Sequence, residues 1–298
     1  MVRAQIALLP EGRRLHLRDG PIDLIVEAWG SPANIEAAYR AAADRFVTVL
    51  DELCSELSLL RSATEPDRCT LNGVVARRMH EAVVPFSDKI FITPMAAVAG
   101  AVAEEILGVM IAATPLARAY VNNGGDIALH LAPSESFKIA MIDRPDRPSL
   151  FGTATIVGAD PVRGIATSGW RGRSFSLGIA DAVTVLAPTA AQADAAATVI
   201  ANAVDLPGHP GILRVPANDL QPDSDLGPRL VTRHVPELAP ADIAKALDAG
   251  EAGALSLAAR RLILTAALHL QGRTRLVDAD RVAQPLSAPA PSKAIAHA

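Results

Sequence analysis

Aromatic side chains, cysteine and surplus positive charge are all scarce in this chain of 298 residues. Aromatic residues make up 3% of it and the formal net charge is −4. It therefore lacks both the stacking platforms and the concentrated basic surface of nucleic-acid binders, so we expect no nucleic-acid partner. The two cysteines, Cys54 and Cys69, are too few for a disulfide framework, and neither has a second Cys or a His at metal-ligand spacing. We expect idle thiols in a reducing compartment.

Long apolar runs are scarce as well. The longest uncharged run, residues 90–103, has 14 residues, whereas a membrane-spanning helix needs about 20. The first residues include Glu11 and Arg13 and lack the apolar core of a secretory signal. Half of the chain is nevertheless hydrophobic and a fifth is charged, as in compact globular proteins. These features predict a soluble, cytoplasmic protein without a membrane partner.

The secondary-structure signals mix strands and helices without a regular alternation. Asp19-Gly20 between apolar segments indicates a β-hairpin, and Ser31-Pro32 and Thr93-Pro94 are typical helix starts. This order favours an α+β fold over a doubly wound sheet. Further helices are expected over 240–247 and 253–270. We expect one compact domain over residues 1–280 and a disordered Pro/Ala-rich tail over 281–298.

One predicted helix carries an acid and a hydroxyl on the same face. Thr189 and Gln192 form a capping-box pattern, so Asp194 and Thr198, four residues apart, project from one side. Val199, Ile200 and Ala203 are expected on roughly the opposite side. A carboxylate and a hydroxyl suit a hard cation such as Mg²⁺. The alternative is that Asp194 only favours the helix dipole and Thr198 is solvated.

Two turns add groups that bind anions. Asn122-Asn123-Gly124-Gly125-Asp126 lies between two predicted strands, where it is either an ordinary turn or a close approach to a nucleotide. Residues 167–174 gather hydroxyls, backbone amides and two guanidinium groups, which are the groups that bind phosphate oxygens. The alternative for this second turn is a surface loop anchored by a buried tryptophan.

Taken in chain order, these segments resemble the ApbE-like superfamily, whose best-known members are flavin transferases that move FMN from FAD onto a protein threonine. The matching segments are residues 95–101, Gly124-Gly125-Asp126, Thr167-Ser168-Gly169 and the helix from Ala193 to Thr198. The amino-acid sequences at 168–174 and 223–227 are similar to those of a shorter, uncharacterised cytoplasmic ApbE-like subfamily. The resemblance implies an ApbE-like α+β fold, a mixed sheet with packed helices, and Mg²⁺ held by Asp194, Thr198 and the backbone carbonyl of Ala97. It implies that FAD or FMN binds at ten residues: Asn123, Gly124, Gly125, Asp126, Thr167, Ser168, Gly169, Trp170, Arg171 and Arg173.

The chain also departs from the flavin transferases. Ala99-Gly100-Ala101 has no lysine where the family has Lys-Gly, and residues 174–180 are too short for the family's segment with His, Asp-Pro and Thr-Gly. These departures argue against flavin transfer onto a protein.

We therefore hypothesise a protein that binds a phosphorylated ligand, with a flavin nucleotide as one candidate, and acts as a Mg²⁺-assisted transferase or hydrolase. Two alternatives stay open. In one, Asp181, Arg171 and Arg173 bind a small carboxylate without metal. In the other, the chain is a structural subunit of a metabolic complex, or a homo-oligomer, in contact through the small-residue helix at 95–103.

Overall fold

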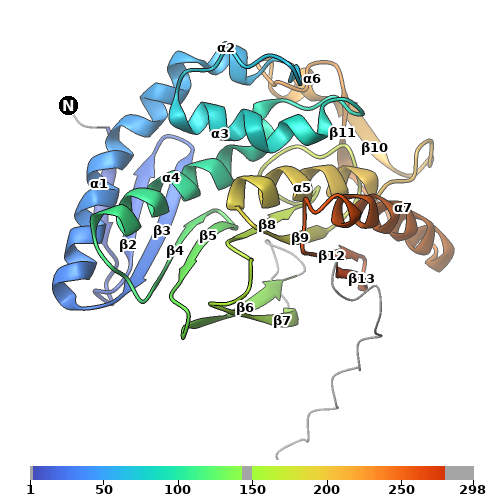
Figure 1. Ribbon diagram of the computed structural model, residues 1–298. Helices are drawn as coiled ribbons and strands as arrows, with labels where there is room; N and C mark the ends of the chain where they lie inside the picture. The colour runs from blue at the N-terminus through green and yellow to red at the C-terminus, as the bar shows by residue number, and fades with distance from the viewer. Residues whose placement is uncertain (1–2, 143–149, 279–298) are drawn as a thin grey trace, which may run out of the picture.

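A single antiparallel sheet organises the molecule. The computed structural model describes residues 3–142 and 150–278 (Figure 1). The nine-stranded sheet has the order β1 (Gln5–Leu8), β2 (Leu15–Asp19), β3 (Ile22–Trp29), β4 (Arg118–Asn123), β5 (Asp126–Leu131), β8 (Gly164–Ser168), β9 (Ala182–Ala187), β12 (Thr265–Leu270) and β13 (Arg273–Asp278). Two two-stranded ribbons are not hydrogen-bonded to this sheet: β6 (Ser136–Ile142) with β7 (Leu150–Val157), and β10 (Leu213–Pro216) with β11 (Leu230–His234).

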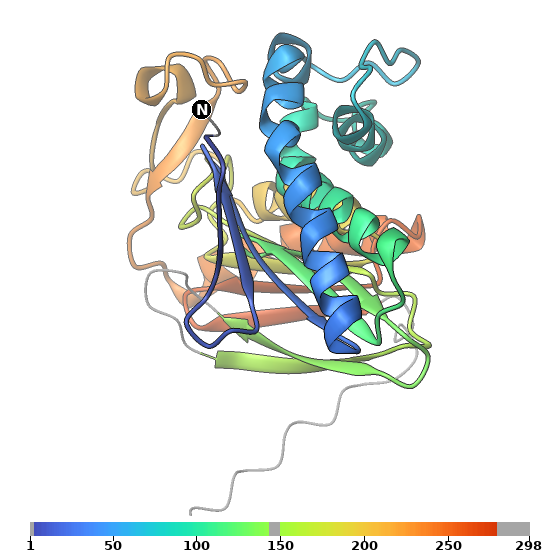
Figure 2. The ribbon, with the colours of Figure 1, turned by 90° about the vertical axis from the view of Figure 1, so that its left-hand side faces the viewer.

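Helices cover one face of this sheet in two tiers. They are α1 (Pro32–Ser55), α2 (Leu57–Leu60), α3 (Val74–Val83), α4 (Val98–Ala113), α5 (Ala190–Ala203), α6 (Ala217–Leu220) and α7 (Pro240–Ala259), with the short 3-10 turns η1 (Val84–Phe86) and η2 (Pro94–Ala97). Helices α1, α4, α5 and α7 contact one another in that order, and α3 lies over α4 and α5 (Figures 1 and 2). Helix α5 is thereby enclosed by the sheet and by three helices.

The helix starts follow the capping signals in the sequence. The Ser31 side chain accepts a hydrogen bond from the Asn34 amide at 3.2 Å, and the Thr189 side chain accepts one from the Gln192 amide at 3.2 Å. Each bond satisfies an amide at the helix start that has no partner inside the helix. The hairpin predicted at Asp19-Gly20 is also present, and Gly20 has the positive φ that the turn requires.

The hydrophobic core has two parts, one on each face of the sheet. Alternation along β5 sends Ala128 into the main core under the helices and Leu129 into a smaller cluster on the other face. Ile156 of β7 belongs to that smaller cluster, so the β6–β7 ribbon covers part of the second face.

The segment Pro94–Ala113 is long and apolar enough to cross a membrane, with a mean hydropathy of 1.8 over its best window. Half of that window is buried within the molecule, and α4 packs against α1, α5 and two strands. Packing in the core therefore accounts for its composition. Within residues 95–103, Ala97, Ala101 and Ala103 are buried and Gly100 contacts α5 inside the same chain. The subunit contact expected at this helix stays a prediction.

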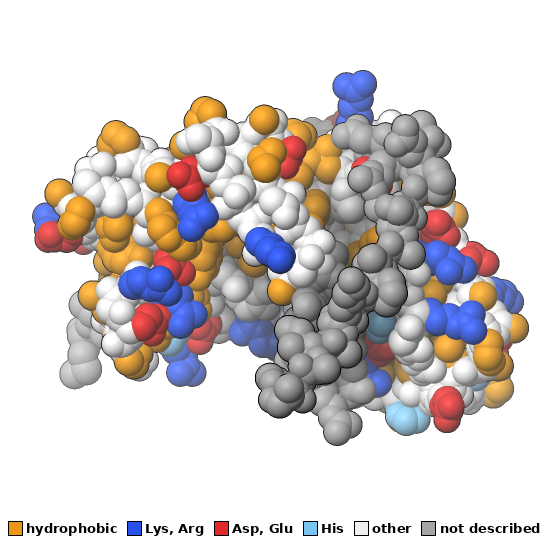
Figure 3. Space-filling view, turned by 90° about the horizontal axis from the view of Figure 1, so that it is seen from below, with side chains coloured by type: hydrophobic (Ala, Val, Ile, Leu, Met, Phe, Trp, Pro, Cys, Tyr) orange, Lys and Arg blue, Asp and Glu red, His pale blue; other side chains and the backbone are white. Residues whose placement is uncertain are grey.

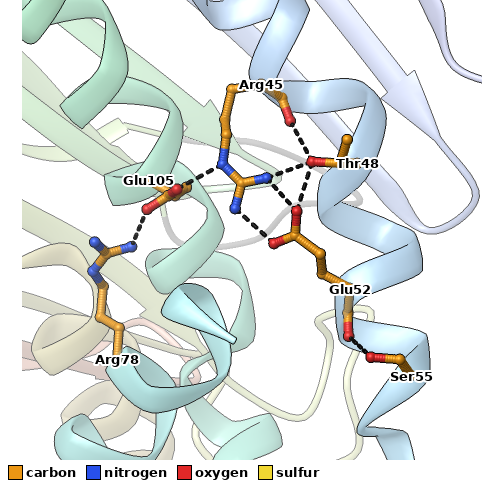
Figure 4. A network of polar contacts seen from close by, with 6 residues as sticks. All are labelled: Arg45, Thr48, Glu52, Ser55, Arg78 and Glu105. Atoms are coloured by element: carbon orange, nitrogen blue, oxygen red, sulfur yellow. Dashed lines mark hydrogen bonds and ion pairs between the residues drawn. The ribbon is translucent and has the colours of Figure 1, made fainter. Parts of the chain in front are cut away.

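A network of ion pairs ties four helices together. Arg45 of α1 donates to Glu52 and to Glu105 of α4, each at 2.7 Å, and Arg78 of α3 lies 3.1 Å from Glu105 (Figure 4). Arg78 also lies 3.2 Å from Glu104, whose other oxygen accepts the Ala191 amide of α5 at 2.8 Å. Because these pairs are partly buried and share partners, they hold the helices in register better than isolated surface pairs would.

Two expectations need revision. The α+β class is confirmed, but neighbouring strands pair antiparallel throughout the described sheet, so the expected mixed sheet is refined to an antiparallel one. The helix predicted over 253–270 is wrong in its second half, because α7 ends at Ala259 and residues 265–270 form strand β12. The predicted domain end at residue 280 and the tail 281–298 lie outside the described residues.

Charged side chains of both signs are interspersed on the face seen from below, among hydrophobic ones (Figure 3). This distribution agrees with the small net charge of the chain.

Candidate functional site

Two carboxylates from distant parts of the chain interact electrostatically where the sheet approaches the starts of α4 and α5. Asp126 is the first residue of β5, and one of its oxygens accepts the Thr167 amide of β8 at 3.3 Å. Asp194 lies in the second turn of α5, and its Oδ2 accepts the Gly100 amide of α4 at 3.0 Å. The β4–β5 turn is tied to the same place, because the Asn123 side-chain amide donates to the Ala99 carbonyl at 3.2 Å.

The electrostatics of this carboxylate pair are unfavourable when both groups are charged. Although both side chains keep some solvent access, the surrounding protein raises the pKa of Asp126 to about 7. Burial also raises the pKa of Asp194 well above its usual range, and the nearby charge of Asp126 raises it further. Carboxylates placed together in this way share a proton or bind a cation.

The carboxylate pair predicts an unusual dependence of stability on pH. Because the pKa of Asp126 is about 7 in the folded protein and near 3.8 when unfolded, the folded state binds more protons between these values. The free energy of unfolding should therefore fall as pH rises from about 4 to about 7. Denaturant unfolding in EDTA at several pH values measures this slope. Asp126→Asn should flatten it, and an equal slope in that variant would contradict the assignment.

The β4–β5 turn allows a guanidinium to approach its backbone. Gly124 and Gly125 both have positive φ, and the Asn122 side chain accepts the Gly125 amide at 2.8 Å. A Cβ on Gly124 would lie 2.8 Å from the Cζ of Arg173 and closer still to one of its nitrogens. Only glycine leaves room for this contact. The Arg173 charge opposes the increase in the pKa of Asp126, so this exposed guanidinium lies near Asp126.

Trp170 and Arg171 form hydrogen bonds with Asp181, outside the carboxylate pair. The buried Asp181 accepts hydrogen bonds from the Trp170 indole at 3.3 Å, from Arg171 Nε at 2.7 Å and from the Gln271 amide at 2.7 Å. The Arg171 guanidinium also lies over the Trp170 ring, 4.4 Å from its centroid. Asp181 and Arg171 therefore neutralise each other, and the structure does not join them with Arg173 in one carboxylate site. Trp170 packs against the main core but is only partly buried, unlike the buried anchor predicted for this turn.

The other predicted residues lie around the carboxylate pair. Thr167 pairs its hydroxyl with Thr184 at 2.9 Å, Ser168 is the last residue of β8, and Gly169 follows it. Thr198 follows Asp194 by one turn of α5 and is partly buried. Ala97 ends η2 with φ −127° and ψ 12°, a break in the helical backbone.

Protein covers helix α5 on several sides. The helix is buried against the sheet, α4 and α7, and Asp194 and Thr198 lie on a partly buried side. Val199 and Ala203, expected opposite, are themselves partly exposed. Alanine-rich helices have a weak apolar stripe, so periodicity could not orient this one.

Sequence reasoning missed two groups that position Asp194: the Gly100 amide and the Glu104 carboxylate. Gly100 and Glu104 are four residues apart and therefore lie on one face of α4, where Gly100 contacts α5 and Glu104 accepts the Ala191 amide at the start of α5. This four-residue spacing of a glycine and a glutamate is the sequence signal for a contact with another helix.

The fold and this site define an α+β protein with two interacting carboxylates between a glycine turn and the starts of two helices. A family model described as AbpE bacteria matches residues 6–276, and the chain belongs to this family. The resemblance to the ApbE-like superfamily is thereby confirmed.

The chain is also similar to uncharacterised archaeal proteins. It is 35% identical to the UPF0280 protein MK0206 of Methanopyrus kandleri over 179 residues, which cover 59% of this chain and 66% of that protein. A UPF0280 protein of Methanosarcina acetivorans is 31% identical over 195 residues, covering 61% and 70%. The match thus spans about two thirds of these relatives. Among solved structures, a mutant of the flavin transferase ApbE from Vibrio cholerae has a TM-score of 0.46 and 12% identity, with 90% of this chain and 97% of that chain covered.

Proposed function

We propose that this protein binds a phosphorylated ligand, with a flavin nucleotide as the leading candidate, together with Mg²⁺, and that it acts as a transferase or hydrolase of the ApbE-like type. The observation that carries the proposal is the carboxylate pair, whose charges are unfavourable without a cation. Membership of the ApbE-like family suggests flavin-related transfer chemistry.

The residues around the carboxylate pair fit a hard cation. Asp194 Oδ2 accepts the Gly100 amide, which fixes the carboxylate beside the proposed cation. The Thr198 hydroxyl and the Ala97 carbonyl at the backbone break supply the further oxygen ligands that Mg²⁺ prefers. No cluster of three His, Cys, Asp or Glu residues occurs in the described part of the chain, so the set relies on hydroxyl, carbonyl and water oxygens. When bound, Mg²⁺ would neutralise the charge that develops on a phosphate.

The ligand would lie along the glycine turn and the end of β8. The Arg173 guanidinium can pair with a phosphate oxygen, as guanidinium groups commonly do. The turn from Asn123 to Asp126 lies beside Thr167, whose amide donates to Asp126, so this turn and the residues Thr167, Ser168 and Gly169 would line the ligand. Trp170 and Arg171 would support this surface through Asp181 rather than touch the ligand. Since the chain lacks the family's lysine and histidine elements, we propose that the acceptor is not a protein threonine.

Binding of FAD with and without Mg²⁺ tests this function. We expect FAD to raise the melting temperature more strongly with Mg²⁺ than without it, because the cation bridges the carboxylates and the phosphates. Isothermal titration calorimetry should show about tenfold or greater loss of FAD affinity in Arg173→Gln, which removes a charged hydrogen bond.

Arg77→Gln, on the exposed side of α3, is the control and should bind FAD normally. Equal FAD binding by Arg173→Gln, or no effect of Mg²⁺ on the wild type, would overturn the proposal. Stabilisation by an organic acid that Arg173→Gln abolishes and Mg²⁺ does not affect would favour the carboxylate alternative at this site.

A further inference from the structure

The loop that joins β10 to β11 contacts the segment just before α4. Residues 223–227 of this loop are one of the stretches that resemble the ApbE-like subfamily, and the proposed function assigns them no role. One oxygen of Asp225 accepts a hydrogen bond from the Thr93 hydroxyl at 2.5 Å. The two residues are 132 positions apart in the chain, so only the folded protein brings them together.

The Thr93 hydroxyl is used differently from those of the other helix starts. Thr93 is 2% exposed and precedes Pro94, the first residue of η2. Ser31 and Thr189 stand in the same position and accept an amide of their own helix, whereas within the described residues the Thr93 side chain caps no amide of η2. Its hydroxyl donates instead to a carboxylate, in a charge-assisted bond that is stronger than one between neutral groups. The start of η2 is therefore held by Asp225, from outside the turn.

The other end of η2 leads directly into the carboxylate pair. The turn ends at Ala97, and Gly100, three residues later, donates its amide to Asp194 at 3.0 Å. Because the alanine at position 97 has no side-chain oxygen that could cap α4, the Asp194 carboxylate takes this role. The turn also contacts α5. The Ala97 carbonyl thus belongs to a turn that is held by Asp225 at its start and followed by the Asp194 contact at its end.

Two further contacts fix the loop itself. Asp223 pairs with Arg61 at 2.9 Å, and the Arg229 guanidinium lies over the Phe91 ring, 3.2 Å from its centroid. Since Phe91 belongs to the segment just before η2, more than the Asp225 bond docks the loop there. Loss of the Asp225 charge should therefore weaken one hydrogen bond without releasing the loop.

We infer that Asp225 is a positioning residue for the proposed cation site, because it fixes Thr93 and with it the η2 turn whose Ala97 carbonyl would bind Mg²⁺. This inference rests on the proposed function. A backbone carbonyl cannot be turned by a side-chain rotation, so its direction depends on how the turn is held. Residues that orient metal ligands without touching the metal contribute about 10–100-fold to its affinity. Asp225 acts in this way on a ligand that belongs to the backbone.

Magnesium titration of Asp225→Asn and Thr93→Val tests the inference. Each variant weakens or removes the hydrogen bond, and only the first changes the charge of the loop. Calorimetry on the full chain should show about tenfold weaker Mg²⁺ binding in both, at a temperature where circular dichroism shows them folded. Thr93→Ser keeps the hydroxyl and should bind Mg²⁺ as the wild type does. Asp223→Asn makes the same chemical change in the same loop, so it is the matched control and should also bind normally.

Hydrogen exchange in EDTA gives a second readout that needs no metal. The Ala96 amide donates to the Thr93 carbonyl at 3.1 Å within η2, so it reports how firmly the turn is held. This amide should exchange about fivefold faster in Asp225→Asn and Thr93→Val. It should exchange at the wild-type rate in the two control variants.

The possible failures are distinguishable. Unchanged exchange at Ala96 in Asp225→Asn, or a wild-type Mg²⁺ affinity in this variant, overturns the inference and leaves the proposed function intact. An equal loss of affinity in Asp223→Asn also overturns it, because the loop as a whole would then be responsible. If the wild type binds no Mg²⁺, the proposed function fails, and the inference fails with it.

Discussion

Asp194→Asn is expected to make the metal-free protein more stable and to abolish its response to magnesium. In the wild type two carboxyl groups interact, and both have raised pKa values because burial disfavours their charged forms. Asparagine keeps an oxygen that can accept the Gly100 amide but carries no charge. The free energy of unfolding in EDTA should therefore rise by about 1–2 kcal/mol.

Stabilisation by Mg²⁺, in contrast, should be lost in this variant. If Mg²⁺ binds the folded wild type, it stabilises the protein by about 2.7 kcal/mol at a concentration 100 times its dissociation constant. Asp194→Asn removes the principal charged ligand, so its unfolding midpoint should be the same with Mg²⁺ and with EDTA. Chemical denaturation of both proteins in both buffers measures the four values.

Asp44→Asn is the matched control, since it makes the same chemical change on the exposed side of α1. It should leave both the stability and the magnesium response unchanged. A variant at Asp194 that is less stable in EDTA would show that this carboxylate is mainly structural. An undiminished magnesium response would show that the ion binds elsewhere.

Local signals in the sequence predicted the parts of the fold that depend on neighbouring residues. The N-caps at Ser31 and Thr189 and the turns at Gly20 and Gly124 each involve residues a few positions apart. The chemistry of such a turn or cap is complete within its own segment. The order of the ApbE-like motifs then predicted that Asp126 and Asp194 belong to one site.

What the sequence could not show depends on partners far along the chain. Residues 265–270 form an apolar run whose helical or extended state is decided by pairing with β9 and β13, and periodicity cannot separate these states in short buried runs. Arg171 looks like an anion ligand until folding brings Asp181 beside it. Likewise, the raised pKa of Asp194 arises only once folding has buried it near Asp126.

The second large effect is expected at Gly100, where α4 and α5 come closest. A Cβ at this position would lie 2.8 Å from the amide nitrogen of Ala191 and closer still to the carbonyl oxygen of Ala190. These are backbone atoms of a buried helix, so no side-chain rotation relieves the clash. Gly100→Ala should therefore lower the free energy of unfolding by about 3 kcal/mol, although alanine is the better helix former by about 1 kcal/mol.

Gly108→Ala separates the clash from helix propensity. Gly108 lies in the same helix and is exposed, and a Cβ there would meet no atom within 4 Å. The free energy of unfolding of this variant should be higher than that of the wild type by about 0.5–1 kcal/mol. Denaturant unfolding of the two variants beside the wild type gives both values, and equal effects of the two substitutions would contradict close packing at Gly100.

The same substitution also reaches the proposed site. The Gly100 amide holds Asp194 at 3.0 Å, so a shift of α5 that accommodates alanine must lengthen or bend this hydrogen bond. Gly100→Ala should then lose most of the magnesium-dependent stabilisation even at temperatures where it remains folded. If it unfolds early but keeps the full magnesium response, the packing of α4 on α5 is independent of the metal site. If the stability and the magnesium response both decrease, the glycine that permits the close contact also positions the Asp194 carboxylate.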